Sequence, residues 1–505
     1  MKKFFAIFVA ICMLVGVLCI TAFAEEAPKD ELPEPAAGTV LRTTASKGDD
    51  IVLVGDYTSF EDGWNAAMKI AGNKSEMKKN GYDRIVVDIY TDWTAKDGNF
   101  TSDAWWEKNG DGFDNDTIYI PADARVTLNL NGYTINRGLT KDINDGEVIF
   151  INDDADVIIN NGTITGGNSN SEGGGLYIEG GANVTLNNVH IVGNYVYNDD
   201  GAGIYMYGGS TLTMNGGSIA NNMMTCMNVN LVYGGGIYIE ESTANFKNVT
   251  FQNNHSGGRP VYTRDKTETY HSYGAAIYAD ESIVNIDTCY FYDNGHHRGN
   301  FLDTYCVISV KNDSEMTIKN TIFTGNGGAQ HFTNGHSSVY IDTKLFYTND
   351  SDLTIENCQF VKNNASILLE MTRTSYLNVS DTSFTDNNAT IYSGSVASSA
   401  TSSFVNCTFD RNYTSGYSFE FAEGGNHPTF EDCNFGNSSF NNRSRATIVD
   451  TDAPDGAGSI FGAGSLTMVI ALLALIASGV CLVLIVDMKK KLVSTAVSGD
   501  VETEE

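Results

Sequence analysis

The feature that most constrains the fold of this chain is an internal repeat of variable length. The segment 184–191, Val-Thr-Leu-Asn-Asn-Val-His-Ile, has relatives along most of the sequence. These relatives begin at Val126, Val157, Leu212, Ala244, Val284, Met316, Leu353, Leu377, Ser402 and Pro428. From Val157 onward, successive copies begin 24 to 40 residues apart. Helical repeats keep a nearly constant length, so this variation excludes tetratricopeptide and ankyrin arrays.

Each repeat is predicted to form three short strands. It opens with alternating apolar and polar residues, the signature of a strand with one buried face. A second strand ends in Phe-x-x-Asn or Ile-x-x-Asn, and a third follows a glycine-rich segment, as in Gly203-Ile-Tyr-Met206. Asparagine tolerates the left-handed backbone of a sharp bend, and stacked amides can hydrogen-bond along a ladder. The asparagines expected in this ladder are Asn194, Asn222, Asn254, Asn294, Asn326, Asn363, Asn387 and Asn412.

Three strands per repeat, with insertions at the turns, predict an all-β solenoid: a right-handed parallel β-helix over 126–445. The preceding segment, 49–125, combines strand-like stretches at 51–54 and 84–90 with an amphipathic helical stretch at 60–79. Because a solenoid needs its first coil covered, this segment is predicted to be a small α/β cap. A separate carbohydrate-binding module is the alternative.

The two ends of the chain predict export and membrane anchoring. Residues 1–24 combine a basic start, an apolar run and a small-residue site, as in a cleaved signal peptide; an uncleaved anchor is the alternative. A polar spacer, 25–48, follows. After a linker at 446–464, the apolar segment 465–487 is long enough to cross a bilayer as one helix, and a buried core helix is the alternative. Lysines at the start of the tail, 488–505, place that tail in the cytoplasm and the β-helix outside the cell.

The charge of the chain narrows its partners. It carries 62 acidic and 31 basic residues, a net charge of −31. Such a surface repels nucleic acid and suits cations, basic partners or neutral glycans. No cofactor or metal site is predicted. Calcium stays an open option, because 111–116 resembles a calcium loop only loosely and lacks the closing glutamate.

The Phe-x-x-Asn and Gly-Gly-(Ala/Gly)-(Ile/Leu/Val) motifs over 126–437 resemble the repeats of bacterial polymorphic outer-membrane proteins and related β-helix adhesins. The resemblance implies the β-helix fold and suggests a role at the cell surface. The chain departs from that family, because a single apolar helix stands in place of the family's outer-membrane domain. In that respect it is more similar to β-helix surface proteins of Gram-positive gut bacteria.

The first candidate site is a patch of histidine and arginine. Six of the eight histidines fall in three successive repeats, in turns after the ladder asparagines or in the long insertions. Stacked coils would gather these turns on one edge, where they could bind an anionic sugar or a divalent metal. The alternative is that exposed turns simply accumulate polar residues. This predicted His–Arg patch comprises His255, Arg259, His271, His296, His297, Arg298, His331 and His336.

The second candidate site is a stripe of tyrosines on the third strands. These tyrosines alternate with inward apolar residues, so they should face outward and stack about 4.8 Å apart. Sugars and protein partners favour such aromatic faces, whereas a ladder that only stiffens the sheet is the alternative. The predicted tyrosine stripe comprises Tyr177, Tyr205, Tyr238 and Tyr278, with Tyr340 next in line.

Four cysteines share one place in the repeat: Cys289, Cys358, Cys407 and Cys433. Other repeats have Gly, Val or Thr there, so the position is predicted to be a small inward slot that holds buried free thiols. Cys407 and Cys433 lie in adjacent coils, and a disulfide between them is the alternative.

No catalytic residue is identified. Glycoside hydrolysis needs two carboxylates at a set separation, and lyases need a base, usually with calcium or basic residues near the uronate. No polygalacturonase-like set of motifs is present, and Asn152-Asp153-Asp154 and Asn198-Asp199-Asp200 stand alone. The sequence therefore favours an adhesin or glycan-binding protein over a polysaccharide lyase or glycoside hydrolase acting on acidic glycans. Its expected partner is a glycan, or the surface of a host or neighbouring cell.

Overall fold

A computed structural model describes most of the repeat region and the segment before it. The described residues are 32–95, 113–114, 117–226, 231–258, 261–262, 267–268, 271–295, 304–328, 331–334, 337–340, 343–396, 400–414, 416–421, 427–440 and 446–449. The predicted signal peptide, membrane segment and tail lie outside them. In the part of the chain that is described, no helix is long and apolar enough to cross a membrane.

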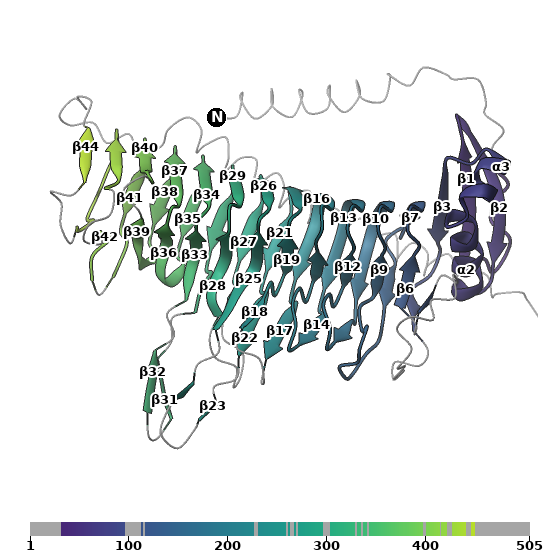
Figure 1. The fold of residues 1–505 in the computed structure, drawn as a ribbon, viewed down its shortest axis with the longest axis horizontal. Helices are drawn as coiled ribbons and strands as arrows, with labels where there is room; N and C mark the ends of the chain where they lie inside the picture. The colour runs from purple at the N-terminus through teal and green to yellow at the C-terminus, as the bar shows by residue number, and fades with distance from the viewer. Residues whose placement is uncertain are drawn as a thin grey trace, which may run out of the picture. The chain divides into compact units, whose positions relative to one another are not determined.

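The repeats wind into a parallel β-helix, with successive coils stacked along the chain (Figure 1). Sheet A supplies two adjacent faces of each coil, and its coil-to-coil pairs are parallel. Its first row consists of β7 (Arg125–Asn129), β10 (Asp156–Thr165), β13 (Asn183–Val192), β16 (Thr211–Ala220), β20 (Thr243–Lys247), β26 (Ile283–Asp287), β29 (Glu315–Lys319), β34 (Asp352–Glu356), β37 (Tyr376–Ser380), β40 (Ser402–Val405) and β43 (Thr429–Glu431).

The second row of sheet A contains the Phe-x-x-Asn strands. It continues through the second halves of β10, β13 and β16, which bend at Asn161, Asn188 and Gly216, all with positive φ. Its separate strands are β8 (Thr134–Asn136), β21 (Thr250–Gln252), β27 (Tyr290–Tyr292), β30 (Ile322–Thr324), β35 (Gln359–Val361), β38 (Ser383–Thr385) and β41 (Thr408–Asp410).

Sheet B closes each coil and contains the predicted third strands. Its strands are β5 (Phe113–Asp114), β6 (Thr117–Ile120), β9 (Ile149–Ile151), β12 (Leu176–Ile178), β15 (Ile204–Met206), β18 (Leu231–Tyr233), β19 (Ile237–Glu240), β25 (His271–Asp280), β28 (Thr304–Lys311), β33 (Lys344–Asn349), β36 (Asn364–Arg373), β39 (Asn388–Val396) and β42 (Phe419–Phe421). The three-strand coil is therefore confirmed.

A fourth face, sheet C, was not predicted. It inserts between sheets A and B in four coils, as β11 (Asn168–Ser169), β14 (Tyr195–Tyr197), β17 (Met223–Cys226) and β22 (His255–Gly258). Two short antiparallel pairs lie in the long insertions of the later coils: β23 (Val261–Tyr262) with β24 (Thr267–Glu268), and β31 (His331–Asn334) with β32 (Ser337–Tyr340).

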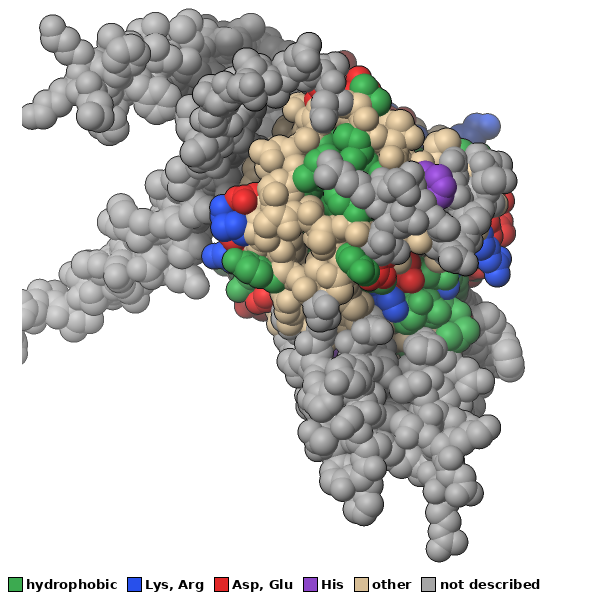
Figure 2. Space-filling view, turned by 90° about the vertical axis from the view of Figure 1, so that its left-hand side faces the viewer, with side chains coloured by type: hydrophobic (Ala, Val, Ile, Leu, Met, Phe, Trp, Pro, Cys, Tyr) green, Lys and Arg blue, Asp and Glu red, His purple; other side chains and the backbone are tan. Residues whose placement is uncertain are grey.

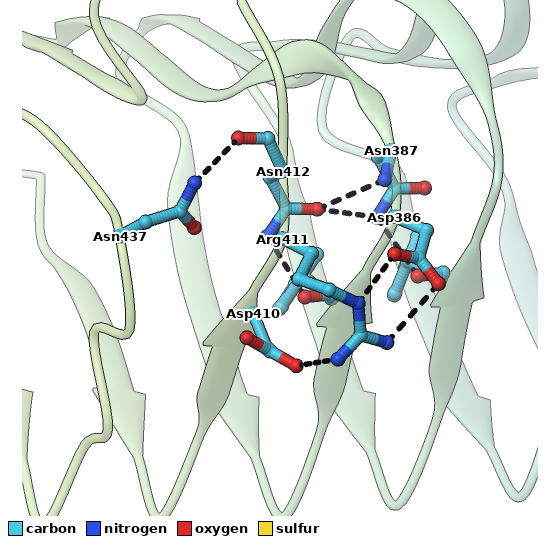
Figure 3. A network of polar contacts seen from close by, with 8 residues as sticks. Asp386, Asn387, Asp410, Arg411, Asn412 and Asn437 are labelled. Carbon is cyan, nitrogen blue, oxygen red and sulfur yellow. Dashed lines mark hydrogen bonds and ion pairs between the residues drawn. The ribbon is translucent and has the colours of Figure 1, made fainter.

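The predicted asparagine ladder is present at the corner that follows the second row. Each amide nitrogen donates to the amide oxygen of the next ladder asparagine, at 2.9–3.1 Å. Most of these amide nitrogens also donate to a backbone carbonyl in the preceding coil. Asn294 Nδ2, for example, donates to the backbone carbonyl of Phe251 at 2.8 Å. Figure 3 shows the end of the ladder, where Asn437 Nδ2 reaches the backbone carbonyl of Asn412 at 3.4 Å.

The ladder asparagines do not themselves take the left-handed backbone, which corrects one expectation. Positive φ falls on the residue directly before each of them, for example Asn253 (54°), Asp293 (53°) and Arg411 (49°). The ladder asparagine follows the bend and turns its amide inward, where it is buried. Arg411 is free to point outward, and it pairs with Asp386 at 2.7 Å and with Asp410 (Figure 3).

Phenylalanines fill the interior of the later coils. Phe251, Phe291, Phe323, Phe360, Phe384 and Phe409 are fully buried and stack ring on ring, with centroids 4.5–5.2 Å apart. The inward register of Phe360, Phe384 and Phe409 follows directly from the parallel pairing of β35, β38 and β41. Dense stacking of this kind makes the core sensitive to loss of even one ring.

The cysteine slot holds free thiols. Cys289, Cys358 and Cys407 are buried and Cys433 is partly buried, and the structure has all four as free cysteines. Threonine takes the same role in other coils, since the Thr321 hydroxyl accepts from the Cys289 backbone at 3.2 Å. The alternative of a Cys407–Cys433 disulfide is not what this structure contains.

The segment before the repeats is an α/β unit built on the first coil. Strand β1 (Leu41–Lys47) lies between β2 (Asp50–Tyr57) and β3 (Arg84–Ile89) in antiparallel pairs. Two helices, α2 (Phe60–Ala71) and α3 (Lys74–Asn80), connect β2 to β3. The side chain of Ser59 caps α2 by accepting from the Asp62 backbone at 3.2 Å, and α2 buries Trp64 completely.

Two predicted boundaries move. Strand β1 lies within the segment read as a spacer, because its polar sequence gives no hint of the two strands that flank it. The β-helix also begins before 126: β3 pairs in parallel with β7, β4 (Trp93–Thr94) with β8, and β6 with β9. The cap and the first coil therefore share strands. Arg84 joins them, donating to the backbone carbonyls of Val126 at 2.8 Å and Asp156 at 2.9 Å.

The last described coils carry exposed aromatic side chains. Figure 2 views the side that lies at the left of Figure 1, where hydrophobic side chains form separate patches and charged ones lie toward the edge. Tyr413 is 60 % exposed and Tyr417 is 46 % exposed. One more short strand, β44 (Thr447–Val449), starts inside the predicted linker, and the backbone of Thr447 donates to Pro428 at 3.1 Å.

Candidate functional site

The predicted His–Arg patch is only partly within the described residues. Arg259, His296, His297, Arg298 and His336 lie outside them. His271 opens β25 and His331 opens β31, where the backbone alone is described. His255 is corrected: it is 2 % exposed, because the chain continues after Asn254 into sheet C and His255 pairs with Met223. It is a buried residue of a strand in sheet C and does not lie in an exposed turn.

The predicted tyrosine stripe is present: its four tyrosines occupy equivalent positions on neighbouring strands. Tyr177, Tyr205, Tyr238 and Tyr278 pair in sequence across sheet B, and Tyr119 and Phe150 extend the row at its start. Neighbouring ring centroids lie 4.7–5.6 Å apart. After Tyr278 the register passes to Ser309 and then to Tyr347. The prediction that Tyr340 continues this row is wrong, because Tyr340 lies in β32 of the antiparallel β31–β32 pair.

The stripe is far less exposed than predicted. Tyr238 is 7 % exposed and Tyr278 is 3 % exposed, because each ring covers the next and the glycine-rich segment before each strand passes over them. At Gly201, which has φ +71°, a β-carbon would lie 2.8 Å from the β-carbon of Tyr205. Burial raises the pKa of all four phenols. The centre of the stripe thus serves mainly as a packed ladder.

An acidic group borders the early part of the stripe. The Asp200 carboxylate accepts from the Tyr233 backbone at 2.6 Å, and burial raises its pKa well above the ordinary value. Burial raises the pKa of the neighbouring Asp199 to about 6, with a further contribution from the charge of Glu172. These are carboxyl groups that hold protons more tightly than usual.

A second group of partly exposed aromatic side chains lies beside and beyond the buried end of the stripe, over β18, β25, β28 and β33. Here four half-buried tyrosines and two lysines form what we call the tyrosine–lysine cluster. The ring centroids of Tyr233 and Tyr273 are 5.9 Å apart, those of Tyr273 and Tyr305 are 4.8 Å apart, and those of Tyr305 and Tyr347 are 5.3 Å apart. The members of the cluster are Tyr233, Tyr273, Tyr305, Lys311, Lys344 and Tyr347.

Tyrosine rings hold the two ammonium groups of this cluster. Lys311 Nζ lies 3.7 Å from the Tyr273 ring centroid and within 5.7 Å of those of Tyr233 and Tyr347. Lys344 Nζ lies 3.8 Å from the Tyr305 ring centroid. Such cation–π contacts contribute about 0.5–1 kcal/mol at exposed sites and about 2 kcal/mol when desolvated. Burial lowers the pKa of Lys311.

A local irregularity in sheet B assembles the cluster. The register between β25 and β28 shifts on both sides of Tyr273, so that Tyr273 pairs with Cys306, and Cys306 pairs with Lys344. Register shifts of this kind re-aim side chains at the edge of a regular sheet. Cys306 is completely buried beneath the cluster, and burial raises its pKa to about 11.

Sequence reasoning missed Tyr233, Tyr273, Tyr305, Tyr347 and both lysines. One signal was available: Tyr233-Gly234 and Tyr273-Gly274 precede equivalent strands in consecutive coils. The lysines had no such signal, because their placement depends on the register shift rather than on the repeat.

No metal centre is formed by the described residues: nowhere among them do three His, Cys, Asp or Glu side chains gather closely enough to hold an ion. An acidic cleft of about 680 Å³ lies at the corner between sheets B and A, lined by Glu281, Asp313, Glu315, Asp350 and Asp352 among others. The loosely calcium-like segment 111–116 lies outside the described residues except for Phe113 and Asp114.

Comparison with known proteins agrees with the architecture. The family model for the right handed beta helix region matches residues 109–272 and 235–435, together more than half of the chain. No curated protein and no solved structure matches it. The matched residues contain the stacked coils and the tyrosine–lysine cluster. The chain belongs to the family defined by the right handed beta helix region.

Proposed function

We propose that this chain is a cell-surface glycan-binding protein, anchored by the apolar segment 465–487, that binds through the outer face of sheet B. The observation that carries the proposal is the tyrosine–lysine cluster. Its tyrosines are half-buried, so each ring is held rigidly while part of it stays open to solvent. Rigid aromatic rings beside polar groups suit the apolar faces and hydroxyls of sugars, and tyrosine is enriched at binding surfaces.

The place of the cluster along the chain supports the same proposal. Long insertions leave the coil just before β25, β28 and β33, the strands that carry the cluster. Insertions in solenoid repeats tend to gather on the binding face. The predicted His–Arg patch draws its residues from these insertions, so the two candidate sites are neighbours in sequence and differ in which residues contact the ligand.

The test is a glycan-array screen of the full-length chain, followed by binding measurements with the best glycan. Replacing Tyr305 and Tyr347 with alanine should weaken that binding at least tenfold, about 1.4 kcal/mol. The matched control replaces the exposed tyrosines of the last coils, Tyr413 and Tyr417, and should leave binding unchanged. Loss of binding only on changing Arg259, His297 and Arg298 would move the site to the insertions.

A second candidate function rests on Asp199 and Asp200. Glycoside hydrolysis requires a carboxylic acid that keeps its proton near neutral pH beside a second carboxylate, and burial raises the pKa of Asp199 to about 6. The enzyme hypothesis expects the wild-type chain to shorten an acidic polysaccharide and Asp199→Asn to abolish this cleavage. We favour binding without cleavage, because Asp200 is itself buried and its raised pKa disfavours the ionised form that the second carboxylate needs.

A further inference from the structure

The two lysines of the cluster are unusual in this chain. Acidic residues outnumber basic ones two to one; some cations of the described residues pair with carboxylates, as Arg84 does with Asp156, and other lysines, such as Lys247 and Lys362, are exposed to solvent. Among the described residues, neither Lys311 nor Lys344 forms a salt bridge. Lys344 is 7 % exposed, so its stem is buried although its charge has no carboxylate partner there. A buried cation without an anion is costly unless a ligand supplies the anion.

One carboxylate that acts on the cluster, Asp280, is already engaged in hydrogen bonds. Asp280, whose charge acts on Lys311, accepts hydrogen bonds from the Tyr278 hydroxyl at 2.8 Å and from Asn312 at 2.6 Å. Burial raises the pKa of Tyr305 and Tyr347, and the charge of Glu370, which pairs with Tyr347 across β33 and β36, adds to this effect. Among the described residues, neither lysine has a carboxylate within salt-bridge distance, and Glu370 marks the side where a second anion is disfavoured.

The side-chain types indicate which anion fits. The cluster contains lysine and no arginine. Arginine's planar fork matches a carboxylate in bidentate fashion, whereas lysine acts as a point charge that suits tetrahedral oxyanions. Burial raises the pKa of Tyr273 to about 12, so its hydroxyl remains a hydrogen-bond donor at neutral pH. Two point charges among phenol donors therefore favour a group with three equivalent acceptor oxygens.

We propose that the tyrosine–lysine cluster is a subsite for a sulfate ester carried by a sugar. The inference rests on the proposed glycan-binding function and specifies its ligand: Lys311 and Lys344 take the sulfate, while Tyr305 and Tyr347 contact the sugar ring. The two lysines also give this part of sheet B a local positive charge on a chain whose net charge is −31, and a local positive charge attracts a sulfate group.

The experiment compares three oligosaccharides of equal length: a sulfated glucan, the same glucan without sulfate, and an oligouronate. Binding to the full-length chain, kept in mild non-ionic detergent, is measured by calorimetry at two salt concentrations. The wild type should bind the sulfated glucan at least tenfold more tightly than the other two, and this preference should shrink at higher salt. In Lys311→Met/Lys344→Met the preference should vanish, so that the sulfated glucan binds no more tightly than the unsulfated one.

Two further variants keep the test decisive. Lys319→Met, which removes an exposed lysine paired with Glu356 on sheet A, should retain the full preference. Glu370→Gln should strengthen binding of the sulfated glucan alone, and it remains informative if the double lysine variant fails to fold. A preference that survives in the double variant, or an oligouronate that binds as tightly as the sulfated glucan, overturns this inference. Failure of all three glycans to bind overturns the proposed function itself.

Discussion

Each ladder asparagine satisfies several buried polar groups at once. Asn326 is fully buried; its amide nitrogen donates to Phe291 at 2.9 Å and Asn363 at 3.1 Å, and its amide oxygen accepts from the backbone and side chain of Asn294. No backbone group of a neighbouring coil could replace these bonds without breaking the sheet pairing. The corner is therefore held by side chains where a sheet ladder would normally hold it.

Replacing Asn326 with alanine should lower the free energy of unfolding by about 3 kcal/mol, because several buried donors and acceptors lose their partner together. The matched control is Asn285→Ala. Asn285 belongs to an exposed outer row, where its side chain donates only to Asn245 at 3.0 Å, and its loss should cost about 0.5 kcal/mol or less. Urea denaturation of both variants measures the difference. Equal losses would show that the inner ladder adds no more stability than the outer row.

Asp199 predicts a pH dependence of stability. Its folded-state pKa of about 6 lies above the ordinary 3.8, so the folded chain binds this proton more tightly than the unfolded chain. This carboxyl group therefore makes the fold less stable as pH rises from about 4 to about 6, and the loss persists above that interval. Asp199→Asn should be more stable than wild type at pH 7, and the gain should fade toward pH 4.

Asp350 provides a control of opposite sign. Hydrogen bonding from the Thr374 backbone at 3.0 Å lowers its pKa, and Arg373 adds to this effect. Asp350→Asn should therefore be less stable than wild type at pH 7, and its deficit should shrink as pH falls below about 4. Unfolding free energies measured at several pH values test both variants. A pH-independent difference between wild type and Asp199→Asn would exclude the raised pKa.

At the scale of elements, the strands of sheet A were predictable because the sequence of each strand alone contains the pattern that identifies it. Alternation and the Phe-x-x-Asn ending mark where a strand begins, which face is buried and where the chain turns. Strand β1 was not predictable in this way, because its sequence Leu-Arg-Thr-Thr-Ala-Ser-Lys is polar and its burial depends on β2 and β3 on either side. Sheet C was missed because its strands have only two to four residues.

The candidate site was predicted less well than the fold. The stripe of Tyr177, Tyr205, Tyr238 and Tyr278 follows from the repeat, and its alignment was predicted correctly, but its burial depends on glycine segments that fold over it. The tyrosine–lysine cluster follows from a register shift beside Tyr273, which no local pattern encodes. Repetition thus reveals the scaffold, while the departures from repetition assemble the surface that we propose binds the glycan.

The cap should be needed to prevent the edge strand of the first coil, β7, from pairing with strands of other molecules. Strand β3 covers β7, and Arg84 binds two backbone carbonyls of the first coils. Removing residues 25–112 would leave the edge of β7 open, and exposed strand edges recruit further strands. The shortened chain should therefore form large assemblies in sedimentation velocity. A variant lacking only 25–32 should behave as the full chain does, and a monodisperse shortened chain would make the cap dispensable.

At the scale of the whole molecule, the described residues give a rigid scaffold, and the predicted ends decide where it acts. A parallel β-helix holds its binding face on rigid sheets, so little ordering is lost on binding. The same fold hosts both enzymes and binding proteins, so its location is as informative as its shape. At the proposed location on the cell surface, the β-helix would meet polymeric glycans long enough to span several coils of sheet B.

The predicted anchor can be tested without knowledge of the ligand. The segment 466–486 carries no charge, and lysines follow it at 489–491. A helix of this length would span the apolar part of a bilayer, and the lysines would keep its end at the cytoplasmic side. Deleting 466–486 should move the protein from the membrane fraction to the medium, as followed by immunoblotting of cell fractions. The control deletes 492–505 instead and should leave the protein in the membrane. If the chain without 466–486 stays in the membrane, the apolar run within 1–24 is retained as the anchor.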